Sequence, residues 1–421
     1  MKDRARDDCF ALPPGTRWTP VDEALARLRD GVLPVTAFEE VPLAEAAGRF
    51  LALPAIAERD NPVVANAAVD GYALAHADAQ PGAEGRAVLA LAEGRAAAGL
   101  ARPPALPRGR AMRILTGAAI PEGADTVVLQ EDAEVAEGLV SLRLPKRAGA
   151  NVRPAGEDAE RGATLLPAGR RLTPADLARL AVAGVGTVAV HEQLRVGVLS
   201  TGSELVQPGA DPDGPGTFDA NRPMLLAAMR AMGFEAVDLG AVADDEAAVR
   251  AALDDGAARA DAILTTGGAS AGDEDHVSRL LSAEGALSVW RIAVKPGRPL
   301  AFGRWRGAVM MGLPGNPVAA YVCALVFARP ALVALAGGDW PEPVGYPLPA
   351  AFAMTKKPGR REFLRARLAP DGRVERYHSE GSGLTGGLSW ADGLVELPDE
   401  EITLAEGDPV RFLPWSSFGI A

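Results

Sequence analysis

Cysteine and positive charge are both scarce in this 421-residue sequence. The two cysteines, Cys9 and Cys323, lie too far apart for a disulfide framework or a metal-binding spacing, so we expect a reducing compartment, the cytoplasm. Lys and Arg number 43 against 55 Asp and Glu, which gives a formal net charge of −12. This balance disfavours non-specific binding to nucleic acid or to an anionic membrane, so an anionic ligand must meet a local basic cluster.

Uninterrupted apolar runs are also lacking. Residues 1–15 hold no apolar core of signal-peptide length, so secretion is not expected. The longest apolar stretch, residues 317–338, is interrupted by Arg329 and Pro330, whereas a membrane span takes about 20 consecutive apolar residues. We therefore predict a buried helix pair there. Aromatics make up only 5%, but 47 Gly and 34 Pro indicate many short elements and tight turns, and the length predicts several domains.

Apolar β-branched runs and amphipathic helical segments alternate from residue 194 to residue 285. This alternation predicts a doubly wound parallel sheet with helices on both faces. Such sheets bind ligands where their strands end. The loops "STGSEL", "TTGGASAGDED" and "GLPGNP" should therefore share one rim and form a site.

Two β-rich modules flank this region. Residues 66–150 and 345–421 carry short alternating runs bounded by Gly and Pro. Helical segments near residues 20 and 172 each show Thr as a candidate N-cap and Pro at the first helical position. We expect these two segments to form one split domain that the first β module interrupts.

The loops of the predicted rim each have a structural alternative. "GLPGNP" is a rigid turn in its simplest interpretation, but its place on the rim favours oxyanion binding by the backbone N–H groups of Gly315 and Asn316. Glu204 is either a capping acid or a residue of the cleft. Lys295 and Arg298 lie between prolines in "VKPGRP", which suits pre-organised recognition of an oxyanion better than a solvated turn does.

Two further acidic motifs have ordinary explanations. Asp70 precedes Gly71, a pairing typical of a hairpin turn. Arg153, Glu157 and Asp158 read as a surface salt-bridge cluster in a stiff turn. From composition alone neither motif has a catalytic role.

Nine segments, in chain order, resemble the molybdopterin molybdenumtransferase family, which includes the MoeA-like proteins and the gephyrin E domain. These segments are "VDGYAL", "RILTGAAIPEGADTVVLQED", "NVRPAGEDA", "STGSEL", "FDANRPML", "TTGGASAGDEDH", "VKPGRPLAFG", "GLPGNPVAAY" and "GRREFLRARL". The resemblance implies an elongated homodimer that inserts molybdenum from molybdate into the dithiolene of adenylylated molybdopterin and releases AMP.

The implied domains divide the chain into five segments. A split N-terminal domain takes residues 16–60 and 149–190, and a β-rich domain, residues 61–148, is inserted in it. An α/β molybdopterin-binding domain follows at 191–338, and a C-terminal β-barrel at 339–421. The family's cleft lies between subunits, so Asp70 and Thr116 should act across the dimer.

The resemblance and the rim loops together give three sets of candidate residues. The catalytic set is Asp70, Thr116, Asp158, Glu204 and Asp275. The substrate-binding set is Thr201, Gly202, Thr266, Gly267, Gly268, Gly315, Asn316, Lys295, Arg298, Arg365 and Ser382. The metal-binding set is Asp244, Asp275 and Glu204.

The loop "GGASAGDEDH" explains why a metal is expected. Its glycines could supply amides to a phosphate, yet Asp273, Glu274 and Asp275 follow directly. A carboxylate about 5 Å from a phosphate charge costs roughly 3 kcal/mol at a dielectric near 20. Because the candidate ligands are carboxylates rather than clustered Cys or His, we expect Mg²⁺, held by Asp275. Asp273 and Glu274 are left unassigned; favourable charge at the start of the next helix is the simplest interpretation.

The sequence departs from the family's pattern at two places. Ala67, Ala68 and Val69 stand where relatives often have Ser-Ala-Met, so a hydroxyl is missing near Asp70. Arg replaces a common Lys at 291 and 298, which keeps the charge but changes the hydrogen-bond geometry.

The residues leave two other functions as alternatives. A molybdopterin adenylyltransferase shares the Gly-Gly loop and a similar "GLPGNP" turn, although it lacks the β modules. A non-catalytic scaffold of the gephyrin type would not turn over substrate. A molybdopterin adenylyltransferase and molybdoenzyme chaperones are possible partners; nucleic acid and membrane are not expected.

Overall fold

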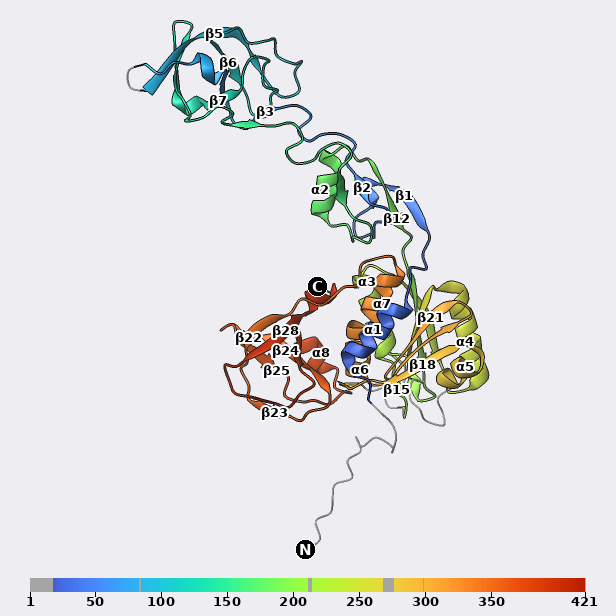
Figure 1. Ribbon diagram of the computed structural model, residues 1–421. Helices are drawn as coiled ribbons and strands as arrows, with labels where there is room; N and C mark the ends of the chain where they lie inside the picture. Colours follow the sequence, from blue (N-terminus) through green and yellow to red (C-terminus); the bar gives the residue numbers. More distant parts are fainter. Residues whose placement is uncertain (1–17, 83–84, 211–213, 268–275, 298, 421) are drawn as a thin grey trace. The chain divides into compact units, whose positions relative to one another are not determined.

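The computed structural model describes residues 18–420 apart from 83–84, 211–213, 268–275 and 298. Its contacts divide the chain into two compact units (Figure 1). One comprises residues 1–39, 48–52 and 190–421, and the other residues 40–47 and 53–189. The predicted α/β region and C-terminal β module fall in the first unit, and the first β module in the second.

A six-stranded mixed sheet organises the α/β region. Its strands, in spatial order, are β16 (Glu235–Val242), β13 (Arg195–Thr201), β17 (Ala262–Thr266), β21 (Ala308–Leu313), β20 (Pro299–Trp305) and β18 (Ala286–Arg291). The first four are parallel, as predicted, but β20 and β18 are antiparallel to their neighbours. The prediction of a wholly parallel sheet is therefore wrong at this edge. Arg306 and Gly307, with φ of 48° and 99°, form a two-residue turn suited to an antiparallel hairpin.

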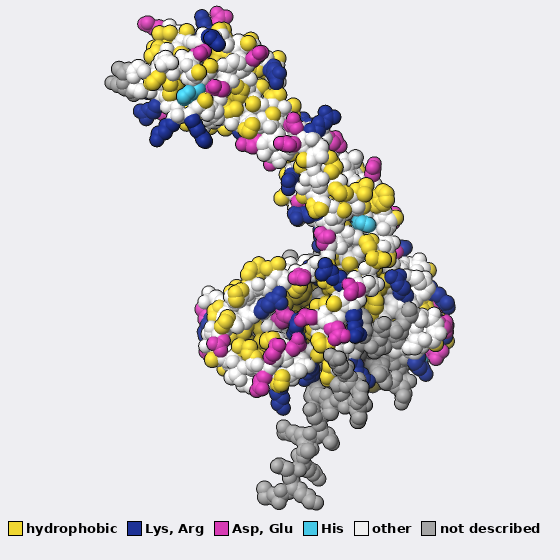
Figure 2. All heavy atoms as spheres, viewed as in Figure 1, with side chains coloured by type: hydrophobic (Ala, Val, Ile, Leu, Met, Phe, Trp, Pro, Cys, Tyr) yellow, Lys and Arg dark blue, Asp and Glu magenta, His cyan; other side chains and the backbone are white. Residues whose placement is uncertain are grey.

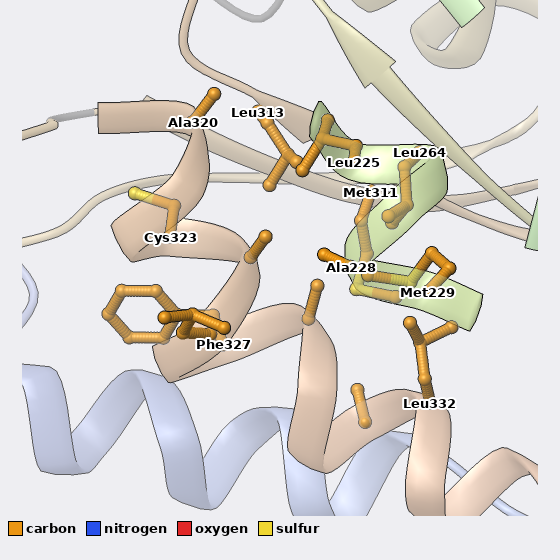
Figure 3. Packing of buried hydrophobic residues seen from close by; sticks show 14 of the residues in the cluster. Leu225, Ala228, Met229, Leu264, Met311, Leu313, Ala320, Cys323, Phe327 and Leu332 are labelled. Carbon is orange, nitrogen blue, oxygen red and sulfur yellow. The ribbon is translucent and has the colours of Figure 1, made fainter. Parts of the chain in front are cut away.

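Helices cover both faces of this sheet. One apolar cluster joins it to α1 (Val21–Gly31), α3 (Asn221–Ala231), α6 (Pro317–Cys323) and α7 (Arg329–Leu335). A second cluster joins its other face to α4 (Glu246–Arg259) and α5 (His276–Glu284). Figure 3 shows part of the first cluster, with side chains of α3, β17 and β21 packed together: Leu225, Met229, Leu264, Met311 and Leu313. Burial of each large side chain contributes roughly 1.5–3 kcal/mol.

The long apolar stretch is a core helix. Residues Pro317–Leu335 are apolar and long enough to cross a membrane, but 78% of that window is buried inside the fold. A π-helical turn, Ala324–Ala328, connects α6 directly to α7, so the predicted pair is one continuous helix. Pro330 has no N–H to donate, and a π turn accommodates the missing hydrogen bond.

The helix starts were only partly predicted. Thr173 caps α2 (Pro174–Val182) with a full capping box, and Asp245 caps α4. Thr19 does not cap α1, because the N-cap residue is Pro20. The backbone of Thr19 instead pairs with the segment around Ile292: its N–H donates to Arg291 O at 2.9 Å, and its carbonyl accepts from Ala293 N at 2.8 Å.

The C-terminal module is built on a second six-stranded sheet. Along it lie β19 (Val294–Lys295), β24 (Arg361–Leu368), β26 (Gly393–Leu397), β28 (Pro409–Pro414) and β22 (Tyr346–Pro349), and β25 (Val374–Arg376) pairs with β24. The β-rich module predicted at residues 345–421 is confirmed by these strands. Strands β23 (Met354–Lys356) and β27 (Ile402–Leu404) form a separate pair, and α8 (Gly386–Trp390) follows the loop that carries Ser382. Because β19 belongs to this sheet, Lys295 lies directly beside Glu362 of β24.

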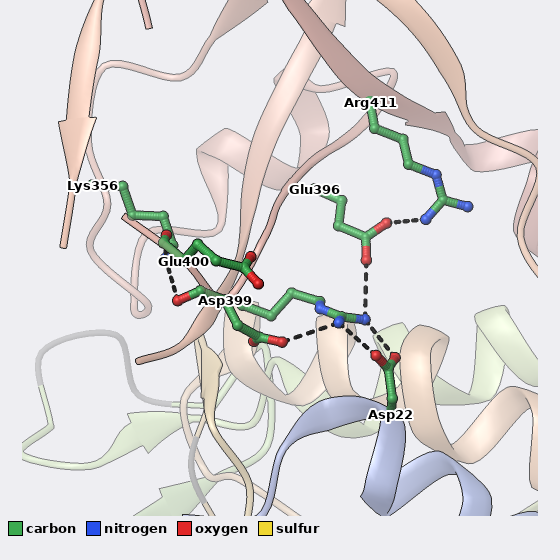
Figure 4. A network of polar contacts seen from close by, with 7 residues as sticks. Asp22, Lys356, Glu396, Asp399, Glu400 and Arg411 are labelled. Carbon is green, nitrogen blue, oxygen red and sulfur yellow. Dashed lines mark hydrogen bonds and ion pairs between the residues drawn. The ribbon is translucent and has the colours of Figure 1, made fainter. Parts of the chain in front are cut away.

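Arg361 links the C-terminal sheet to α1 through Asp22, Glu396 and Asp399, which Figure 4 labels. Its guanidinium donates to both oxygens of Asp22, at 2.7 and 2.9 Å, and to Asp399 at 3.1 Å, and it lies 3.5 Å from Glu396. Burial lowers the pKa of Arg361, but the surrounding carboxylates outweigh that effect and raise it. The network therefore holds α1 against the strands that carry part of the candidate site.

The second unit contains the predicted β-rich module. Its six-stranded sheet has the order β7 (Thr126–Leu129), β4 (Gly71–Leu74), β6 (Arg110–Ile114), β5 (Arg86–Ala96), β9 (Leu139–Arg143) and β8 (Ala133–Ala136). The unit also contains α2 and two short antiparallel pairs: β2 (Ala55–Ile56) with β11 (Thr164–Leu166), and β3 (Asn66–Ala67) with β10 (Val152–Arg153). Among the described residues, the other short strands are β1 (Phe38–Pro42), β12 (Thr187–His191), β14 (Leu205–Val206) and β15 (Thr217–Phe218).

On the face shown in Figure 2, acidic and basic side chains are interspersed over the C-terminal strands. A mixed surface of this kind fits the expectation, drawn from net charge, that binding of anions depends on local sites.

Candidate functional site

Three parallel strands end side by side at one edge of the α/β sheet. Ser200 of β13 is in register with Thr266 of β17, which in turn is in register with Leu313 of β21. The predicted rim therefore exists for the loops that follow Thr201, Thr266 and Leu313.

Gly267 fits this rim only because it has no side chain. A Cβ atom there would lie 2.5 Å from the carbonyl oxygen of Thr201 and 2.9 Å from its hydroxyl, and the backbone φ is +86°. The Thr266 side chain is buried against Ser200, with their hydroxyl oxygens 3.2 Å apart. Thr266 thus shapes the rim, and the backbone of Gly267 reaches its surface.

The "GLPGNP" loop faces the Gly267 loop across the rim. A Cβ on Gly315 would lie 3.9 Å from Gly267 Cα, in ordinary contact. Gly315 and Asn316 are exposed and immediately precede α6. Among the hydrogen bonds of the described residues, none is donated by either amide. These two N–H groups are therefore available to an anion at the start of the helix.

Glu204 and Asp244 lie on adjoining loops of the same rim. Ser203 joins the loops: its backbone N–H donates to Asp244 Oδ2 at 3.2 Å, and its hydroxyl accepts from Asp244 N at 3.0 Å. Within the described ranges no three Asp, Glu, His or Cys residues form a metal-binding group. Two carboxylates still suit Mg²⁺, because this ion keeps several waters and takes its other ligands from substrate phosphates.

Lys295 lies between two carboxylates. Its Nζ is 3.1 Å from Glu362 Oε2 and 2.7 Å from Glu380 Oε2. Burial lowers the pKa of Lys295, but the hydrogen bond to Glu380 and the charge of Glu362 outweigh burial and raise it. The same hydrogen bond lowers the pKa of Glu380. Lys295 is therefore a charged cation that both glutamates neutralise in this structure.

Arg365 supports the loop that carries Ser382. It is 5% exposed and donates to the carbonyl oxygens of Leu384 at 2.7 Å, Ser379 at 2.5 Å and Gly381 at 3.2 Å. The carbonyl of Ser382 in turn accepts from the N–H of Val318, in the first turn of α6, at 3.0 Å. This bond ties the loop to the start of α6.

A small hollow marks this basic part of the site. Lys295, Arg365 and Arg376 line it, together with Tyr377, Ser379 and Glu380. Glu380 partly neutralises this cluster, because it lies 2.7 Å from Lys295 and 3.5 Å from Arg376. A larger groove, of about 560 Å³, lies elsewhere among α1, α7 and the C-terminal strands, and no predicted site residue lines it.

Asp70 and Thr116 form a defined pair in the second unit. The backbone N–H and the hydroxyl of Thr116 both donate to Asp70 Oδ1, each at 2.7 Å. These two bonds lower the pKa of Asp70. Asp70 is therefore a fixed, partly exposed carboxylate rather than only a hairpin residue.

The predicted triad of Arg153, Glu157 and Asp158 is only half correct. Arg153 Nε lies 2.9 Å from Glu157 Oε2, but Asp158 accepts from Asn61 Nδ2 at 2.9 Å instead. The partner of Asp158 is almost a hundred residues away in the chain, so the local spacing could not reveal it. Three other candidates, Gly268, Asp275 and Arg298, lie outside the described residues.

Comparison with known proteins shows the same order of parts along the whole chain. Three family models match in succession: the MoeA N-terminal region (domain I and II) at residues 19–184, a probable molybdopterin binding domain at 197–334, and the MoeA C-terminal region (domain IV) at 347–415. The molybdopterin molybdenumtransferase of Haemophilus influenzae is 33% identical over 402 residues, 94% of this chain and 98% of that protein. The chain belongs to the molybdopterin molybdenumtransferase (MoeA) family.

Other members of the family show similar sequence identity and a similar structure. The enzyme of that name from Synechococcus elongatus is 34% identical over 89% of this chain and 94% of its own. A crystal structure titled as the molybdopterin biosynthesis moeA protein of Pyrococcus horikoshii has a TM-score of 0.80 at 27% identity, over 94% of this chain and 100% of that chain. The MoeA-type multidomain fold with mixed sheets is thereby confirmed.

Sequence reasoning missed three residues of this MoeA-family site. Glu362 and Glu380 are the partners of Lys295, and Asn221 donates from Nδ2 to Gly315 O at 2.7 Å. A carboxylate that neutralises a predicted anion-binding lysine leaves no local signal when it lies 67 or 85 residues away. Asn221 did leave a signal, an Asn at the start of a helix in "FDANRPML".

Proposed function

We propose that this protein is a molybdopterin molybdenumtransferase, which inserts molybdenum from molybdate into the dithiolene of adenylylated molybdopterin and releases AMP. The observation that carries the proposal is full-length membership of the family, at 33% identity over 94% of the chain to an enzyme of that name. The rim formed by Gly267, Gly315 and Asn316 supports it, because free amides and small residues suit close approach of a phosphorylated ligand.

The residues divide between the two substrates. The backbone amides at residues 266–268 and 315–316 hold the phosphate and pterin of adenylylated molybdopterin. Lys295, Arg365 and Ser382 receive molybdate, with Arg365 acting through the loop it supports. Water cleaves the phosphoanhydride, and AMP leaves. The two dithiolene sulfurs then bind molybdenum, and one oxide of molybdate leaves as water with the two thiol protons. Thr116 holds the Asp70 carboxylate so that it can orient the attacking water.

Mg²⁺ is the proposed metal. Glu204 and Asp244, with Asp275, would hold it. When bound, it would neutralise the charge that otherwise opposes a phosphoanhydride beside carboxylates. Asp158 lies in the family motif "NVRPAGEDA". This place in the motif implies a catalytic role, so we propose that Asp158 takes part in the same reaction.

Reconstitution tests the function. Purified protein with adenylylated molybdopterin, molybdate and Mg²⁺ should release AMP and form molybdenum cofactor, measured by chromatography and by activation of a cofactor-free molybdoenzyme. Chelation of divalent metal should lower AMP release by about a hundredfold or more, because a metal at a transferring phosphate contributes several kcal/mol. In a parallel assay with molybdopterin and ATP in place of the adenylylated substrate, ATP consumption would instead indicate an adenylyltransferase. Unchanged AMP release in the presence of chelator would contradict the role of Mg²⁺.

We further propose a cytoplasmic homodimer with a shared cleft. The split helical domain (16–60 and 149–190), the inserted β-rich domain (61–148), the doubly wound α/β domain (191–338) and a C-terminal β-barrel (339–421) are its proposed parts. Buried Cys323 is compatible with a reducing compartment. Asp70 and Thr116 of one subunit would serve the rim of the other.

Mixed dimers test the shared cleft. Asp70→Asn and Glu204→Gln change exposed or partly exposed carboxylates, so both variants should fold. Each alone should lose most activity. Subunits mixed one to one and allowed to exchange should recover about a quarter of wild-type activity, because half the dimers are mixed and each has one intact site. No recovery, with exchange verified by a labelled subunit, would contradict the shared cleft.

A further inference from the structure

Asn221 has a buried acceptor atom without a partner at the rim. The residue begins α3 and is 8% exposed. Its Nδ2 donates to Gly315 O at 2.7 Å. A carbonyl oxygen can only accept, so the nitrogen must face Gly315 and the free atom must be Oδ1. Among the described residues Oδ1 is buried and has no hydrogen bond.

The position of Asn221 is fixed by its neighbours. Arg222 donates from its backbone N–H to Asp219 Oδ1 at 3.1 Å, and its guanidinium bonds Asp238 Oδ2 at 2.6 Å and Gln207 Oε1 at 2.9 Å. These bonds hold the start of α3 in place. Oδ1 therefore cannot easily turn towards water, and buried acceptors in folded proteins are seldom left unbonded.

Asn221 adjoins the rim where the proposed substrate would bind. Asn221 contacts Gly315, and Gly315 faces Gly267 across the rim. An unbonded carbonyl oxygen repels phosphate oxygens and selects a donor instead. In the proposed substrate the rigid donors are N–H groups of its heterocycles, the pterin and the adenine.

We propose that Asn221 Oδ1 accepts a hydrogen bond from a heterocyclic N–H group of the bound substrate. Asn221 then has two functions: Nδ2 holds the "GLPGNP" loop, and Oδ1 recognises the heterocyclic ring of the substrate by a hydrogen bond. This inference rests on the proposed function and adds a residue that orients the substrate. One heterocycle binds at Asn221, while the phosphate binds the free amides of the rim.

Binding to the full-length protein tests the role. Calorimetry would measure the dissociation constants of neopterin phosphate, a stable pterin phosphate, and of AMP. Asn221→Ala should weaken one of them about tenfold, the effect of one hydrogen bond inside a binding site. Asn221→Ser, which suits a helix start, serves as a second variant should Asn221→Ala fold poorly. Gln207→Ala, which removes a partner of Arg222 at the same helix start, is the matched control and should leave both constants within about twofold.

Each outcome decides the proposal. Selective weakening of neopterin phosphate assigns the pterin, and selective weakening of AMP assigns the adenine. Equal affinities in all variants, or an equal loss for both probes that Gln207→Ala reproduces together with a lower melting temperature, would overturn it, as would a wild type that binds neither probe. The proposed function fails separately, through absence of AMP release in reconstitution.

Discussion

Replacing Gly267 with alanine is expected to lower the free energy of unfolding by about 2–4 kcal/mol and to reduce AMP release roughly a hundredfold. The added Cβ would lie 2.5 Å from the carbonyl oxygen of Thr201, and that oxygen belongs to the backbone of β13. The residue also has φ of +86°, a conformation that costs an alanine roughly 1–2 kcal/mol. The loop must therefore move, and misplacement by about 1 Å is enough for a hundredfold loss of rate.

Gly315→Ala is the matched control for this change. Gly315 lies on the facing loop, has no positive φ, and would place its Cβ no closer than 3.9 Å to Gly267 Cα. The free energy of unfolding of the Gly315→Ala variant should stay unchanged or rise by up to about 1 kcal/mol, because alanine restricts the unfolded chain. Urea unfolding monitored by circular dichroism would measure the free energy of unfolding of both variants. Equal destabilisation of the two would show that the contact with Thr201 does not constrain the rim.

The sequence predicted most of the regular structure because local patterns determine it. Alternating apolar residues identified β5, β6, β7 and β9, and a Thr-Pro start identified α2, whose capping box needs only residues 173–176. The same Thr-Pro pattern failed at α1. There the backbone of Thr19 pairs with residues 291–293 instead, and a tertiary contact of this kind overrides a local capping preference.

The edges of both sheets also contain strand pairings that local sequence patterns do not predict. β19, two residues long, joins β24 of the C-terminal sheet, and β20 turns back on β21 to make the α/β sheet mixed. Neither pairing follows from apolar periodicity, because periodicity identifies strands but not their neighbours. A purely parallel sheet was the natural prediction from alternating strands and helices, and only the turn at Arg306 and Gly307 contradicts it locally.

The candidate site was predicted best where strand ends and loop backbone form it. The rim of Thr201, Gly267 and Gly315 depends on strand ends, which the alternation of elements located. Charged residues were harder, because the distant partners of a charge decide what it does. Lys295 and Arg365 were both expected to bind an oxyanion directly, yet Lys295 is paired with two glutamates and Arg365 with three carbonyl oxygens.

Arg365→Met is expected to lower the free energy of unfolding by about 3–5 kcal/mol and to abolish molybdate-dependent cofactor formation. Methionine is apolar and unbranched, but it leaves the carbonyl oxygens of Ser379, Gly381 and Leu384 without their donor. Each hydrogen bond from a charged donor contributes about 1.5–3 kcal/mol. The loop that presents Ser382 then loses its support. Arg365→Lys should recover only part of the loss, since one ammonium cannot reach three oxygens in different directions.

Arg367→Met provides the control on the same strand. Arg367 is exposed, pairs with Glu375 at 2.7 Å and lies 4.6 Å from the ring centroid of Trp390, so its loss should cost no more than about 1 kcal/mol. Urea unfolding and the molybdate concentration needed for half-maximal cofactor formation would be measured for both variants. If Arg365→Met raised that concentration while the free energy of unfolding stayed at the wild-type value, Arg365 would bind molybdate itself. A joint loss of stability and molybdate use, absent from Arg367→Met, assigns it to the support of the Ser382 loop.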